Sequence, residues 1–200
     1  MGPTLLGGEK MHILYHVSFD PVENFKLRIP KDRCPNEDNT IPRICFSERL
    51  HLAVSSMPQG GQALRGLLEF NEKYKVKRKI TPILHCYMCS EWEQPGVFLP
   101  PEQIKDKVGD AEGTREWWAI KIPKLNHVVM QVFDAKFRDT TDKFGNKGVV
   151  VDSVGYDVIK ELPENAPELW FGKHGISVRR AMVYVDEMKN ENAGSNSPCW

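Results

Sequence analysis

A histidine and a serine stand at the end of the first apolar run of this sequence. Residues 11–17 read MHILYHV, a run rich in the Ile, Leu, Tyr and Val that favour a β-strand. Ligands commonly bind where strands end, so polar side chains there are well placed to meet one. His16 can donate or accept a hydrogen bond near neutral pH, and Ser18 shares its face of the strand. We expect both to line a cleft; the alternative is a histidine with a purely structural hydrogen bond.

A second apolar run, residues 41–46 (IPRICF), carries a basic and an aromatic side chain. Arg43 can offer a bidentate guanidinium to a phosphate, unless it pairs with an acid of the preceding loop. Ser47 follows the run and has the residue type of a helix N-cap. The free N–H groups of the helix after it would attract an anion. Arg43, Phe46 and Ser47 therefore join the candidate binding residues.

Apolar periodicity predicts the elements that must position these side chains. Helical spacing of apolar residues occurs twice in succession, at Leu50, Ala53, Val54 and Met57 and then at Ala63, Leu64, Leu67 and Leu68. Further strands are expected over 80–88, 117–122, 149–151 and 180–185, a short helix over 101–108, and a turn over 144–148. The segment 128–137 favours neither helix nor strand. Because strands outnumber long helices, the pattern predicts an α+β fold.

Length and composition limit the domain organisation and the classes of function. Two hundred residues with 40% apolar content are typical of one globular domain. We expect a flexible arm over 1–10, one compact domain over 11–188 and a disordered tail over 189–200. Lysine plus arginine and aspartate plus glutamate both number 27, so the formal charge is zero. That balance argues against non-specific nucleic-acid binding, which needs an excess of positive charge.

The cysteines do not predict a metal or disulfide framework. There are five, an odd number at irregular spacing. Cys86 and Cys89 form a C-x-x-C unit, but no second pair completes a zinc site, so we expect no metal. The sequence also shows no N-terminal apolar targeting segment and no run long enough to span a bilayer. We expect a cytoplasmic protein that has no membrane partner.

The front of the chain resembles the ADP-ribosyltransferase-like superfamily. Tyr15-His16-Val17-Ser18 is similar to its early strand with a histidine, and Ile44-Cys45-Phe46-Ser47, leading into a helix that contains Ala53, is similar to its second strand. The resemblance covers roughly the first 60 residues. It implies a split, mostly antiparallel sheet with short helices that binds NAD as a substrate. It also implies that His16 holds the adenine-side ribose and that an aromatic side chain stacks on nicotinamide.

The resemblance implies a glutamate on a late strand that steadies the ribose while nicotinamide leaves. The late segment 180–185 carries Met182 where that glutamate would be sought, and Glu187 lies just beyond it. Glu116, beside Trp117 and Trp118, is the other candidate, because an indole can desolvate a neighbouring carboxylate. Glu116 and Glu187 are thus the two candidate catalytic residues.

Three functions follow from these observations. The first is an enzyme that transfers ADP-ribose from NAD to a macromolecule or hydrolyses NAD. The second, consistent with Met182, is a non-catalytic module that binds a nucleotide or a protein, as in accessory or inhibitor proteins of phages and mobile elements. The third is an RNA-directed relative of the transferase that uses arginines around a phosphate, which the zero net charge disfavours.

Overall fold

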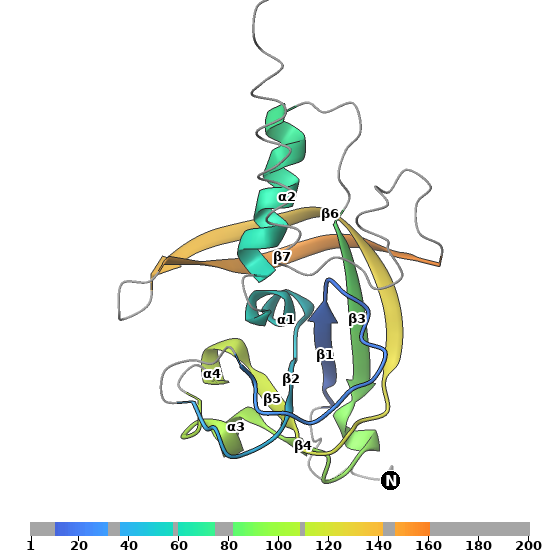
Figure 1. Cartoon of the computed structure of the whole chain (residues 1–200), viewed down its shortest axis with the longest axis vertical. Coiled ribbons are helices and arrows are strands. Elements are labelled where there is room, and N and C mark those ends of the chain that lie inside the picture. Colours follow the sequence, from blue (N-terminus) through green and yellow to red (C-terminus); the bar gives the residue numbers. More distant parts are fainter. Residues whose placement is uncertain are drawn as a thin grey trace, which may run out of the picture.

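The computed structural model describes residues 11–31, 37–57, 60–74, 82–108, 111–141 and 147–160 of the chain. These residues form an α+β domain on a seven-stranded sheet of order β4-β5-β2-β1-β3-β6-β7 (Figure 1). The strands are β1 (Ile13–Ser18), β2 (Ile44–Ser47), β3 (Ile83–Ser90), β4 (Phe98–Leu99), β5 (Glu116–Ala119), β6 (Asn126–Thr141) and β7 (Lys147–Ile159). Every neighbouring pair is antiparallel. The predicted α+β class and mostly antiparallel sheet are therefore confirmed.

The described strands form one sheet, in which the junction between β1 and β2 is the narrowest, with the single pair Tyr15↔Ser47. β1 pairs with β3 along its whole length, from Ile13↔Ser90 to Ser18↔His85. This pairing joins the β4-β5-β2-β1 half to the β3-β6-β7 half. Adjacent strands with continuous pairing hold their side chains at fixed spacing, so β1 is a rigid support for the residues it carries.

The first two helices follow the predicted apolar stripes. They are α1 (Leu50–Ser56) and α2 (Gly60–Tyr74), and the predicted contact residues Ala53, Val54, Met57, Ala63, Leu64 and Leu67 are all buried. The prediction of Ser47 as the N-cap of α1 is wrong. Ser47 is the last residue of β2, and the N-cap is Arg49, which makes no side-chain cap hydrogen bond. Pairing with β1 and β5 extends the strand by one residue and moves the helix start onward.

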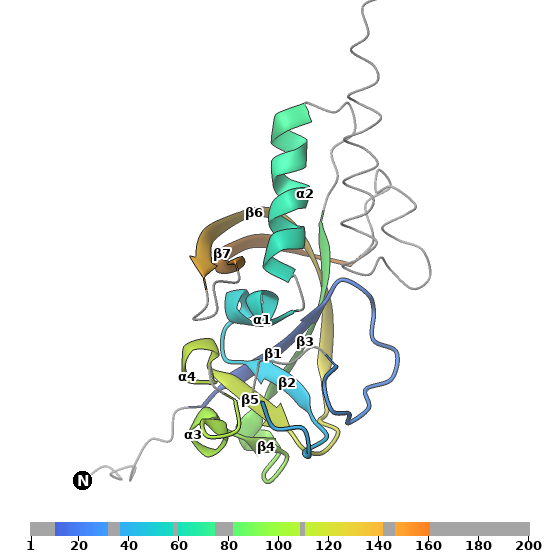
Figure 2. The ribbon, with the colours of Figure 1, turned by 60° about the vertical axis from the view of Figure 1, so that its left-hand side comes forward.

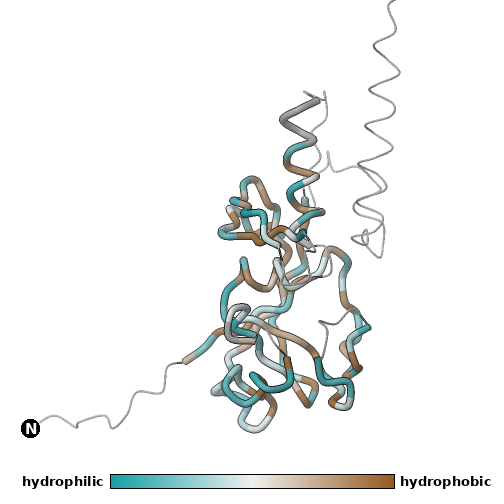
Figure 3. The backbone as a smooth tube through the Cα atoms, turned by 90° about the vertical axis from the view of Figure 1, so that its left-hand side faces the viewer, coloured by the Kyte–Doolittle hydropathy of each residue, from teal (hydrophilic) through white to brown (hydrophobic). Residues whose placement is uncertain are grey.

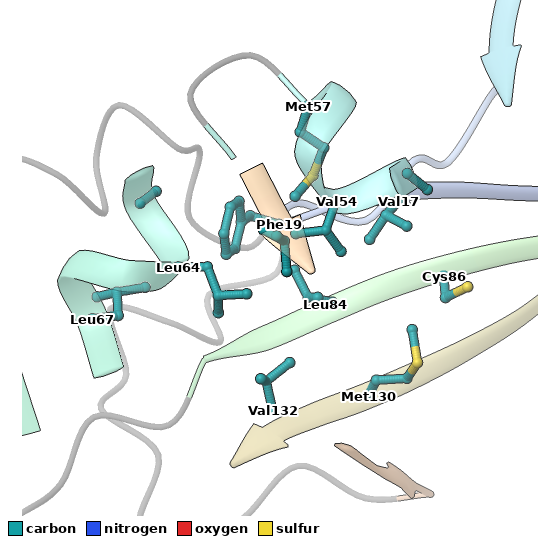
Figure 4. Packing of buried hydrophobic residues seen from close by; sticks show 13 residues of the cluster. Val17, Phe19, Val54, Met57, Leu64, Leu67, Leu84, Cys86, Met130 and Val132 are labelled. Carbon is teal, nitrogen blue, oxygen red and sulfur yellow. The ribbon is translucent and has the colours of Figure 1, made fainter. Parts of the chain in front are cut away.

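The main core lies between these two helices and one face of the sheet, as Figure 4 shows from close by. Apolar side chains from β1, β3, β6 and β7 meet those of α1 and α2 there, among them Val17, Val54, Leu64, Leu84 and Met130. Figure 2 shows α1 beneath α2, with the strands beside and below them. We call this the helix face of the sheet; the opposite one is the loop face.

Two smaller clusters cover the rest of the sheet. On the loop face, Leu14, Phe46 and Trp117 pack with partly buried residues of the segments after β1 and around β4. On the helix face, Trp118 packs against Ile104 of α3 (Pro101–Ile104) and Ala111 of α4 (Ala111–Thr114). The short 3₁₀ helix η1 (Glu91–Glu93) follows β3. Both faces of β2 and β5 are therefore covered.

β6 resolves the segment that the sequence left undecided. It is a 16-residue strand whose first part pairs with β3 and whose later part pairs with β7, with register shifts between Val132 and Asp134 and between Lys136 and Phe137. Those irregularities break the simple alternation of a strand. Several predicted features lie outside the described residues: the arm 1–10, the late strand 180–185, the tail 189–200 and most of the turn 144–148.

Candidate functional site

The strands that carry the predicted site residues are neighbours in the sheet. β2 lies between β1 and β5, and Ser47 pairs with Tyr15 on one side and with Glu116 on the other. Neighbouring strands lie about 4.8 Å apart, so β1 and β5 are separated by about 10 Å. The fold thus places Glu116, from the middle of the chain, on a strand that is separated from the His16 strand by β2 alone.

The candidates are divided between the two faces of the sheet. Paired residues share a face and successive residues alternate. Ser47 and Glu116 therefore lie on the helix face with Tyr15, whereas His16 and Phe46 lie on the loop face. A ligand that touches all four must reach around the end of β2, where Ser47 is the last strand residue.

His16 is held in one orientation and one tautomer. Its Nδ1 lies 2.9 Å from the backbone oxygen of Cys45. A carbonyl oxygen only accepts, so Nδ1 carries the proton and Nε2 is the acceptor of the neutral ring. The rings of Phe25, Phe46 and Tyr87 surround it at 5.3, 5.6 and 6.2 Å between centroids. Burial lowers the pKa of His16, and the charge of Arg28 acts in the same direction. The ring is therefore neutral at pH 7 and can accept a hydrogen bond from a hydroxyl.

Ser18 and Phe46 have local structural partners. The hydroxyl oxygen of Ser18 accepts a hydrogen bond from the backbone N–H of Asp20 at 3.2 Å, which turns the chain after β1. Phe46 is 2% exposed and meets Phe98 edge-on at 5.5 Å. The Phe46 ring thus forms the floor beneath His16 rather than an exposed stacking surface.

Arg43 is enclosed by the protein. Its side chain has no exposed surface, and its guanidinium forms an ion pair with Glu37. Nη1 also donates to the backbone oxygens of Asp38 at 3.0 Å and Ile41 at 2.9 Å. The guanidinium carbon lies 3.8 Å from the ring centroid of Trp118, a cation–π contact. These contacts fix the loop before β2 onto the sheet, which is the structural alternative that the sequence left open.

Glu116 is buried at the start of β5, 8% exposed, beside Ser47, 1% exposed. Its Oε1 accepts a hydrogen bond from the indole N–H of Trp118 at 2.7 Å. Burial raises the pKa of the neighbouring Cys45 thiol well above its ordinary value, and the Glu116 carboxylate raises it further.

The backbone also constrains Glu116. Arg115, directly before Glu116, has a φ of 49°, a left-handed conformation that is uncommon for a residue other than glycine. The carboxylate is therefore held in a fixed position. Glu187, the other candidate, lies outside the described residues.

The sequence reasoning missed a carboxylate on the His16 face. Glu48 accepts hydrogen bonds from Nη2 of Arg115 at 2.7 Å and from the indole of Trp117 at 3.0 Å, and Nδ1 of His12 lies 3.5 Å from it. Burial acts to raise the pKa of Glu48, but the hydrogen bonds and the nearby positive groups lower it overall. The sequence did contain a signal for the position of Glu48. Glu48 follows Phe46 by two residues, so in extended chain it lies on the same face as Phe46, which is also the face of His16.

A surface hollow of about 310 Å³ lies apart from these residues. It is lined by Cys89, Ser90, Glu93, Gln94, Lys124, Leu125 and Asn126. Gln94 closes one wall, because its side chain accepts from the Lys124 N–H at 2.6 Å and donates to the Lys124 carbonyl at 3.1 Å. Of the predicted site residues that the structure describes, none lines this hollow.

Comparison of the chain with protein-family models, with curated proteins and with solved structures gives no match. The class that the structure itself defines is an α+β domain with a mostly antiparallel sheet.

Among the helices of the described residues, none combines the length and the apolar character that crossing a bilayer requires. Figure 3 shows hydrophobic and hydrophilic stretches alternating along the backbone.

Proposed function

We propose that this chain is an ADP-ribosyltransferase-like protein that binds NAD and either transfers ADP-ribose to a macromolecule or hydrolyses NAD. The observation that carries the proposal is the strand order β5-β2-β1. Glu116 on β5 pairs with Ser47 on β2, and β2 is the neighbour of β1, which carries His16. The front-end resemblance calls for a histidine strand, a serine-ended strand and a glutamate on a late strand. In this proposal β5, which carries Glu116 and lies next to the serine-ended β2, takes the place of that late strand.

In this proposal each residue has one role. Nε2 of neutral His16 accepts a hydrogen bond from a ribose hydroxyl. The bond between the ribose C1′ and nicotinamide breaks with its electron pair leaving on nicotinamide, and the Glu116 carboxylate stabilises the positive charge that develops on the ribose. An acceptor oxygen or nitrogen then bonds to C1′ and gives its proton to a base. A carboxylate that is already positioned requires little reorganisation in this step.

The test is an NMR time course of the purified chain with NAD, in which line broadening reports binding and the free nicotinamide signal reports turnover. Glu116→Gln should reduce nicotinamide release at least about a hundredfold with NAD binding retained. His16→Gln should weaken NAD binding about tenfold, the value of one hydrogen bond. His51→Gln, on α1, is the matched control and should change neither. Absence of both broadening and nicotinamide at millimolar NAD would refute the proposal.

A non-catalytic binding module is the second candidate, and one observation favours it. The Glu116 carboxylate is buried and already accepts the Trp118 indole hydrogen bond. A carboxylate committed to a structural bond has less capacity to serve a substrate. Line broadening by NAD without nicotinamide release would support this candidate. Turnover that is lost in Glu48→Gln and retained in Glu116→Gln would instead keep the enzyme and move the catalytic role to the loop face.

A further inference from the structure

Two histidines of neighbouring strands bring their ring nitrogens together on the loop face. His85 lies on β3 and His127 on β6, and the register pairs His127 with Tyr87, two residues from His85. The two histidines are therefore diagonal neighbours on one face. Nδ1 of His85 lies 3.1 Å from Nε2 of His127, and the two ring planes are 19° apart. The ring of Tyr87 stacks on His127 at 4.6 Å and 11°.

The contact between the two rings is a hydrogen bond that involves one proton and one lone pair. At 3.1 Å one of the two nitrogens carries a proton and donates it to the lone pair of the other. To bind one ion through both nitrogens, the donating ring has to carry that proton on its other nitrogen, as the second neutral tautomer of imidazole does. Neutral imidazole is a common ligand of Zn²⁺, Cu²⁺ and Ni²⁺.

The spacing of the nitrogens also suits one ion. Two metal–nitrogen bonds of about 2.0–2.1 Å that meet at roughly 90–109° place the nitrogens about 2.8–3.4 Å apart. The observed 3.1 Å falls within that interval. Rotation of each ring about its broad terminal torsion lets both lone pairs point at one centre. The ring of His127 is exposed and that of His85 is partly exposed, so an ion can enter from solvent.

We propose that His85 and His127 form a two-histidine site for a divalent transition-metal ion of the nitrogen-preferring class, which links β3 to β6. Cu²⁺ binds most tightly in the usual order of these ions, and Zn²⁺ and Ni²⁺ bind less tightly. The described residues contain no cluster of three or more His, Cys, Asp or Glu that could hold a metal. Water therefore fills the remaining positions, so a chelator removes the ion readily. The proposal does not depend on NAD binding.

Titration of the metal-free full chain with Cu²⁺, followed by calorimetry and by electron paramagnetic resonance, tests the site. We expect one equivalent bound with coupling to two imidazole nitrogens, a pattern that separates this site from cysteine thiolates. His85→Gln and His127→Gln should each weaken the affinity at least about tenfold, and His51→Gln should leave it unchanged. Both test positions are at least partly exposed, and a melting curve confirms that each variant is folded.

Thermal unfolding with Zn²⁺ gives a second readout. An ion that binds only the folded chain raises the melting temperature. The rise should occur in the wild type and in His51→Gln and be absent in His85→Gln. Copper affinity that is unchanged in both His85→Gln and His127→Gln, or a signal with no imidazole nitrogen, would overturn the proposal.

Discussion

Replacing Arg43 with methionine tests whether this arginine holds the fold or binds a ligand. The substitution removes a guanidinium with no exposed surface from an ion pair with Glu37, whose side chain is 8% exposed. It also removes two hydrogen bonds to backbone oxygens and the contact with Trp118. Loss of one partner of a buried ion pair costs about 3–5 kcal/mol, because the other charge stays buried. Total stabilities of about 5–15 kcal/mol make that loss large.

Urea unfolding of four proteins measures this effect: the wild type, Arg43→Met, Glu37→Gln and the double variant. We expect Arg43→Met to lose about 3–5 kcal/mol and the double variant to recover at least about 1 kcal/mol relative to the sum of the single changes. Recovery follows because the double variant removes both charges of the ion pair, so that neither is left buried without its partner. If Arg43→Met lost less than about 1 kcal/mol and weakened NAD binding instead, Arg43 would face a ligand and the reasoning would be refuted.

Three further predictions concern packing and pH. A methyl group added at Gly61 would lie 2.4 Å from the Val149 backbone oxygen, so Gly61→Ala should lose about 1–3 kcal/mol in urea unfolding, whereas Gly66→Ala, with open space around it, should gain about 0.5–1 kcal/mol. Leu64 is fully buried in the main core, and Leu64→Ala should lower the free energy of unfolding by about 2–5 kcal/mol; a loss below 1 kcal/mol would contradict the packing. The His85 pKa is about 4 in the folded chain and about 6.5 when unfolded, so the unfolded chain binds more protons between these values and stability falls as pH drops through that window. The loss is about 1–2 kcal/mol after allowance for the partial exposure of the ring, and His85→Gln should remove it from unfolding curves at pH 7 and pH 4.5.

Local periodicity predicted the helices because their contacts are local. The apolar stripes of α1 and α2 recur every three to four residues, and the sheet needs only to accept the face they create. Ser47 shows the limit of that reasoning. Its type favours a helix N-cap, but pairing with Tyr15 and Glu116 keeps it in β2. Those partners are far away in the sequence, so no local sequence pattern predicts the pairing.

The neighbouring tryptophans Trp117 and Trp118 show that the order of residues along a strand predicts which face of the sheet each side chain occupies, which composition alone does not. Successive residues of a strand point to opposite faces, so a strand over 117–122 places Trp117 and Trp118 on opposite faces of the sheet. Trp117 packs with Leu14 on the loop face, and Trp118 packs with Ile104 on the helix face. Both are buried, because loops cover one face of β5 and short helices cover the other. The coverage of both faces depends on segments that the sequence pattern placed less precisely.

The division of the candidate residues between two faces decides how the proposed chemistry has to be assigned. Glu116 faces the helix side, whereas Glu48 contacts Trp117 on the side of His16. Arg115 connects the two, because it binds the Glu48 carboxylate and directly precedes Glu116. Its left-handed backbone conformation stands at the point where the chain enters β5. In the proposed function, a ligand held by His16 would share its face of the sheet with Glu48 and would reach Glu116 only around the end of β2. For this reason Glu48→Gln belongs beside Glu116→Gln in any assay of nicotinamide release.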